Sequence, residues 1–80
     1  MGMSPAQCRA ARSLLGWSQD KLSTTSKVAK ATIANFETGK RAPYERTLLD
    51  MQLALEAAGI IFVADGEAST AGEGVRLKAP

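Results

Sequence analysis

The chain has 80 residues, a formal net charge of +2, one cysteine and no histidine. A chain this short buries only about 60 to 65% of its unfolded surface, so it forms one small domain that dimerisation would stabilise. A lone cysteine forms no internal disulfide, and without histidine the common zinc sites and Cys-His catalytic pairs are excluded. No Gly-rich phosphate loop or nucleophile with a base partner stands in the sequence, so we expect no enzyme activity, cofactor or metal.

The charge is divided unevenly along the chain. Residues 1–46 carry eight basic and three acidic side chains, a formal +5, whereas residues 47–80 carry two basic and five acidic side chains, a formal −3. A basic half suits phosphate binding and leaves the other end for protein contacts, although a solvated mixed surface is the alternative. Because the sequence contains no run of 18 apolar residues and no signal-peptide pattern, we expect a cytoplasmic protein with no membrane contact.

The first element is a helix from Pro5 to Leu15. Ser4 is a favourable N-cap before a proline at the first helical position, and Gly16 can end the helix in a left-handed conformation. We expect Arg9 and Arg12 to be solvated on this helix, with DNA contact as the alternative. The apolar stripe of the helix consists of Cys8, Ala11, Leu14 and Leu15.

Two short helices separated by a tight polar turn follow between Gln19 and Gly39. In the second of them, Ile33 and Phe36 lie three residues apart and anchor one face in the core. The opposite side is short, polar or basic, so nothing bulky would hold it away from base edges in the DNA major groove. Its side chains are Lys30, Ala31, Thr32, Ala34 and Asn35.

The exit from this helix and the long helix after it carry further signals. Gly39 can cap the short helix, and Lys40 and Arg41 emerge beside it, where cations suit phosphates. The long helix covers residues 44–58 and is ended by Gly59. Its core stripe consists of Leu48, Met51, Leu55 and Ala58. Leu49 and Leu53 form a second stripe, which is either a partner surface or extra core.

The C-terminal tail changes to a strand pattern. Residues 60–63 read IIFV and residues 75–78 alternate, so we expect a β-hairpin around a mobile loop at residues 67–74. Because isolated two-stranded ribbons are marginal in water, we expect the tail to dock on the long helix and to pair with its copy in a second subunit. Ile61 and Val63 would lie in that dimer interface. The alternative is a tail that is flexible after Ala64.

The stretches WSQDKL and ATIANFETGKRAP, with Val28 between them, resemble the helix-turn-helix of the Cro and lambda-repressor type, the XRE-like family. The resemblance covers roughly residues 5–63. It implies a mainly α, four-to-five-helix, lambda-repressor-like DNA-binding domain at residues 4–59, followed by a short C-terminal β-strand or hairpin in the tail, residues 60–80. Lys27 replaces the usual glycine of the turn, and Ala29 replaces the usual serine cap. Each departure costs about 1 kcal/mol.

The resemblance implies a sequence-specific regulator of double-stranded DNA, most simply a homodimeric repressor that binds an inverted repeat. We expect base readout from the slim face of the second short helix, that is, from Lys30, Ala31, Thr32, Ala34 and Asn35. The phosphate contacts expected are Gln19, Lys27, Lys40 and Arg41. The dimer contacts expected are Leu49, Leu53, Ile61 and Val63. The alternative function is a protein-interaction module, such as an antitoxin, that binds a protein partner through its tail or its Leu49 and Leu53 face.

Overall fold

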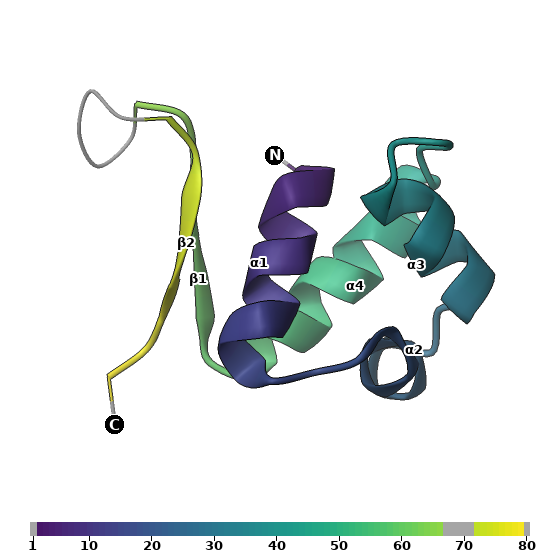
Figure 1. The fold of residues 1–80 in the computed structure, drawn as a ribbon, viewed down its shortest axis with the longest axis horizontal. Coiled ribbons are helices and arrows are strands. Elements are labelled where there is room, and N and C mark those ends of the chain that lie inside the picture. Colours follow the sequence, from purple (N-terminus) through teal and green to yellow (C-terminus); the bar gives the residue numbers. More distant parts are fainter. Residues whose placement is uncertain (1, 67–71, 80) are drawn as a thin grey trace.

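The computed structural model describes residues 2–66 and 72–79, which form four helices and one two-stranded antiparallel sheet (Figure 1). The helices are α1 (Pro5–Leu15), α2 (Gln19–Ser26), α3 (Lys30–Glu37) and α4 (Glu45–Ala57). The strands are β1 (Ile60–Val63) and β2 (Gly74–Leu77). The expected mainly α fold with a C-terminal hairpin is therefore confirmed.

The ends of the first two helices follow from local capping chemistry. The Ser4 hydroxyl accepts a hydrogen bond from Gln7 N at 3.1 Å, and the Gln7 side chain accepts one from Ser4 N at 2.9 Å, which is a complete capping box. Gly16 ends α1 with a φ of 68°. Ser18 caps α2 by accepting from Lys21 N at 3.0 Å. The caps at Ser4 and Gly16 were expected from the sequence.

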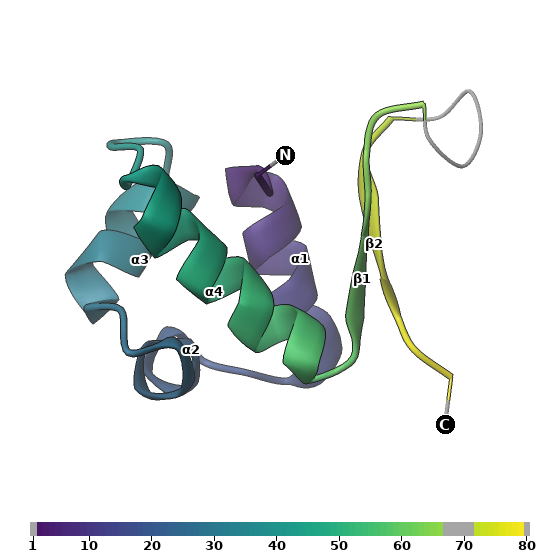
Figure 2. The ribbon, with the colours of Figure 1, turned by 180° about the vertical axis from the view of Figure 1, so that it is seen from behind.

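With the hairpin on the far side of α1 from α2 and α3 (Figures 1 and 2), the core draws on all four helices and on β1. Its buried apolar residues are Met3, Cys8, Ala11, Leu22, Val28, Ile33, Phe36, Met51, Leu55 and Ile60. The expectation that Leu14 belongs to the buried stripe of α1 was wrong, because its side chain is 46% exposed. Residues 8, 11 and 15 follow the spacing of one helical face, and position 14 lies on its flank.

The hairpin packs on two helices, β2 against α1 and β1 against α4. Ile60 pairs with Leu77 and Phe62 with Val75, and Ile60, Phe62 and Val75 pack on the core. Docking of the tail on the long helix was expected and is confirmed, whereas its contact with α1 was not foreseen. Contact with α1 adds a side-chain anchor, because the buried Gln7 amide donates to the carbonyl oxygens of residues 63 and 74, both at 3.0 Å. Of the loop expected at residues 67–74, residues 67–71 lie outside the described part.

Candidate DNA interface

The turn between α2 and α3 holds a lysine in the left-handed region. Lys27 has a φ of 62°, and it stands where the helix-turn-helix that the sequence resembles usually has glycine. Its N–H donates to Ser23 O at 2.8 Å, and the Ser23 hydroxyl donates to Val28 O at 2.6 Å. Val28 N in turn donates to the Ser26 hydroxyl at 3.3 Å, and the Val28 side chain is buried. These bonds hold the backbone in place and offset the cost of the left-handed lysine.

Helix α3 separates a buried face from a slim open one. Ile33, Phe36 and Glu37 are buried. Lys30 and Ala31 are exposed, and the other residues expected to read bases, Thr32, Ala34 and Asn35, are half-buried. The helix begins without a side-chain cap at Ala29, as expected. The open face therefore carries side chains no larger than an asparagine apart from one lysine at its N-terminal end.

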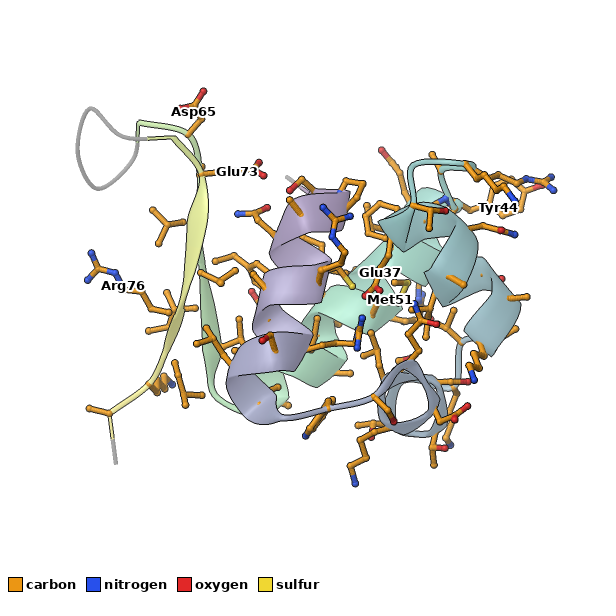
Figure 3. All side chains as sticks on the ribbon, viewed as in Figure 1. Glu37, Tyr44, Met51, Asp65, Glu73 and Arg76 are labelled. Atoms are coloured by element: carbon orange, nitrogen blue, oxygen red, sulfur yellow. The ribbon has the colours of Figure 1, made fainter. Side chains whose placement is uncertain are left out.

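A hollow of about 340 Å³ lies beside this open face. Ala31, Thr32 and Asn35 line it from α3, and the remainder of its wall comes from the loop and the start of α4: Arg41, Ala42, Pro43, Tyr44 and Thr47. The Tyr44 side chain is 86% exposed at the edge of the protein (Figure 3). Tyr44 and Thr47 were not among the residues expected to contact DNA, although an aromatic residue directly after Pro43 in a basic loop was a visible signal.

Lys40 and Arg41 lie in the loop that closes one side of the hollow. Both side chains are exposed, and the backbone N–H groups of both donate to Asn35 O, at 2.9 and 3.2 Å. Gly39, with a φ of 75°, turns the chain at this point. Because the two N–H groups converge on a carbonyl of α3, the loop is fixed to the helix and holds its two cations beside the open face.

Two of the expected DNA contacts have partners within the chain. Lys30 Nζ lies 3.2 Å from Asp20 Oδ1 at the start of α2, and both side chains are mostly exposed. The Gln19 amide, half-buried at the first position of α2, donates to Glu37 Oε1 at 2.9 Å. Lys27, the remaining phosphate candidate, is exposed. Thus the three other phosphate candidates, Lys27, Lys40 and Arg41, are open to solvent. To contact DNA, Gln19 and Lys30 would have to share or give up their present contacts with Glu37 and Asp20.

A buried carboxylate joins α1 to α3. Glu37, whose side chain is 2% exposed, accepts hydrogen bonds from Arg12 Nε and Nη2, both at 2.7 Å. Arg9 Nη1 donates to the Glu37 carbonyl. The expectation that Arg12 is solvated was therefore wrong, because its side chain is only 18% exposed. The missed signal is that Glu37 follows Ile33 by four residues, on the buried face of α3.

The ionisation of this cluster follows from its contacts. Burial alone raises the pKa of Glu37, but hydrogen bonds from Arg12, Gln19 and Cys8 and the charge of Arg12 outweigh it, so the pKa lies below its ordinary value. Burial, followed by the hydrogen bond to Glu37 and its charge, raises the pKa of the Cys8 thiol. The hydrogen bond to Glu37 raises the pKa of Arg12. The cluster therefore holds a carboxylate, a guanidinium and a protonated thiol at neutral pH.

The four expected dimer contacts lie on two faces. Leu49 and Leu53 are 45% and 51% exposed on α4, so they are not extra core. On the hairpin, Ile61 is 43% exposed and Val63 is half-buried.

Within residues 2–66 and 72–79, no cluster of three His, Cys, Asp or Glu side chains is arranged to hold a metal ion. Among the helices of that part of the chain, none is long and apolar enough to cross a membrane.

Comparison with known proteins shows the family to which the chain belongs. A helix-turn-helix family model matches residues 9–56, more than half of the sequence and all of α2, α3 and the turn between them. A search of curated proteins finds no match. The chain belongs to the XRE-like helix-turn-helix family and is a DNA-binding regulator of that type.

Proposed function

We propose that the protein is a homodimeric repressor that reads an inverted repeat in double-stranded DNA. The observation that carries this proposal is the open face of α3, whose small and polar side chains adjoin the hollow and the two exposed cations of the following loop. A face of this kind fits a major groove, because the helix can approach base edges while flanking cations meet the phosphates.

The base contacts divide by chemistry and position. Lys30, at the N-terminal end of α3, can donate to guanine O6 and N7, and the Asn35 amide can pair with the N6 and N7 edge of adenine. Thr32 and Ala34 are small enough for a hydroxyl or thymine-methyl contact, and Ala31 lets the backbone approach. In the complex Lys30 leaves Asp20 for DNA, an exchange with little cost because the pair is exposed.

The phosphate contacts fix the orientation of the helix. Lys27, Lys40 and Arg41 are exposed cations, and Gln19 stands at the N-terminus of α2, where free N–H groups favour anions. Three cations in each subunit make six phosphate contacts in a dimer. The logarithm of the affinity should therefore fall against the logarithm of the salt concentration with a slope of about −5.

Selection of bound sequences from random double-stranded DNA tests this function. A homodimer that places two recognition helices about 34 Å apart should select two inverted half-sites one helical turn apart. If the selected sequences contain only a single half-site, the dimeric form of the proposal is rejected. If they share no consensus, sequence-specific regulation is rejected altogether. Repression is then tested with a reporter whose promoter overlaps the selected site, where expression should fall when the protein is present.

A further inference from the structure

The exposed side of α4 carries a stripe of two leucines between opposite charges. Arg46, Leu49, Leu53 and Glu56 are spaced by three, four and three residues, so they lie along one face of the helix, here called the α4 stripe. All four are exposed. Figure 2 shows α4 from the side on which no other helix or strand of the described chain lies in front of it. About half of each leucine side chain is therefore left uncovered by the described part of the chain.

A hollow lies beside the α4 stripe. Its volume is about 310 Å³, and it is lined by Gly2, Glu45, Leu48, Leu49 and Gln52. The four residues from α4 stand at positions i, i+3, i+4 and i+7, which is the set that forms the hole for one side chain of a facing helix. The occupant that such a hole fits is an aliphatic side chain carried on a second helix.

We propose that this occupant is Leu53 from a second copy of the chain, with the two α4 helices packed antiparallel. The inference rests on the homodimer proposed above and identifies its interface. A two-fold axis that crosses α4 at the level of Met51 exchanges position 49 with 53 and position 46 with 56. The partner's Leu53 then enters the hollow beside Leu49, and Arg46 faces the partner's Glu56.

Charge complementarity selects this arrangement. In an antiparallel pair both ends of the α4 stripe bring an arginine and a glutamate together, whereas a parallel pair would set like charges against each other. Arg46 already lies 3.3 Å from Asp50, but both side chains are exposed, so that pair is weak and can be shared.

The other candidate face lacks such complementarity. On the hairpin, Ile61 pairs with Arg76, and Arg76 points away from the helices (Figure 3). Arg76 is the only charged residue in residues 60–63 and 74–77. Two copies of this face would bring arginines together without a strand carboxylate between them. The leucine stripe on α4 is therefore the better dimer surface.

Charge reversal tests the antiparallel pairing. Arg46→Glu and Glu56→Arg should each raise the dimer dissociation constant about tenfold, because each places two like-charged pairs in the homodimer. An equimolar mixture of the two variants should recover wild-type affinity, since all four end positions are then complementary. Analytical ultracentrifugation measures each case. A mixture that associates no more tightly than either variant alone overturns the proposal.

Substitution of the apolar residues tests the choice of face. Leu53→Asp should give a monomer with the wild-type helical circular dichroism, whereas Ile61→Asp, at a similarly exposed hairpin position, should remain dimeric. The opposite result overturns the α4 interface, yet selection of an inverted repeat would still support the proposed function. A wild-type chain that stays monomeric, both free and on the selected DNA, overturns both.

Discussion

Arg12 and Glu37 form a bidentate ion pair, with two hydrogen bonds of 2.7 Å between α1 and the last residue of the recognition helix. The carboxylate has further donors in Gln19 and Cys8, so its oxygens are fully engaged. Since Gln19 also begins α2, one buried charge connects α1, α2 and α3. The orientation of α3 therefore depends on this pair as well as on the apolar contacts of Ile33 and Phe36.

Removal of Arg12 should destabilise the fold strongly. Arg12→Ala leaves a buried, uncompensated carboxylate, a change that typically costs about 3 kcal/mol or more. Arg41→Ala, at an exposed loop position, should change stability by less than about 0.5 kcal/mol. Urea denaturation measures both. Replacement of the pair by Arg12→Met with Glu37→Leu should recover most of the loss, and a small effect of Arg12→Ala would show that Glu37 is not held as a buried ion.

The same pair should make stability depend on acid. The pKa of Glu37 in the folded protein lies below its ordinary value of 4.5. Its contribution is therefore fully present above about pH 4.5 and is lost as the pH falls through the lower, folded-state pKa. Glu37→Gln should lower the stability at pH 7 and flatten the pH dependence between pH 5 and pH 3. Denaturation curves of the two proteins that shift in parallel with pH would count against this role.

Lys27 should show opposite effects on stability and on DNA binding. Its φ of 62° suits glycine, so Lys27→Gly removes a backbone strain of about 1 kcal/mol from the folded state. The greater conformational freedom of glycine in the unfolded chain cancels part of this gain in stability. The melting temperature should rise by a few degrees. Affinity for DNA should fall, because one phosphate contact is lost in each subunit, and the salt slope should become shallower by about 2. Unchanged affinity would remove Lys27 from the interface.

Asp20 should oppose DNA binding by holding Lys30. Asp20→Asn removes the exposed carboxylate 3.2 Å from Lys30 Nζ, so the lysine is free and one negative charge near the phosphates is gone. We expect a several-fold higher affinity at low salt and a smaller gain at high salt, because exposed charges are screened. Stability should change by less than about 0.5 kcal/mol. A lower affinity would indicate that Asp20 positions Lys30 rather than competing for it.

Local chemistry explains which features could be predicted from the sequence. The caps at Ser4 and Gly16 each depend on residues within one turn, so the identity of those residues is sufficient to predict them. The two strands followed from a change of hydrophobic period. The left-handed conformation of Lys27 was expected because Lys27 replaces the usual glycine of the helix-turn-helix turn. The burial of Ile33 and Phe36 followed from their spacing.

Contacts between distant segments could not be predicted in the same way. Arg12 and Glu37 are 25 residues apart, and Gln7 donates to carbonyls 56 and 67 residues away. No periodicity encodes these partners, because each depends on how the elements pack. The spacing of Glu37 after Ile33 places its carboxylate on the buried face of α3, a signal that was missed. It did not identify the cation that would meet it.

Selection from random DNA with three single variants tests the central claim most directly, because it separates base readout by α3 from phosphate contact by the loop. Asn35→Ala and Lys30→Ala should each relax the preference at one position of each half-site, by about 1 to 3 kcal/mol of base discrimination. Lys40→Ala should weaken all sequences alike and leave the consensus unchanged. The account is contradicted if both α3 variants select the wild-type consensus with wild-type discrimination.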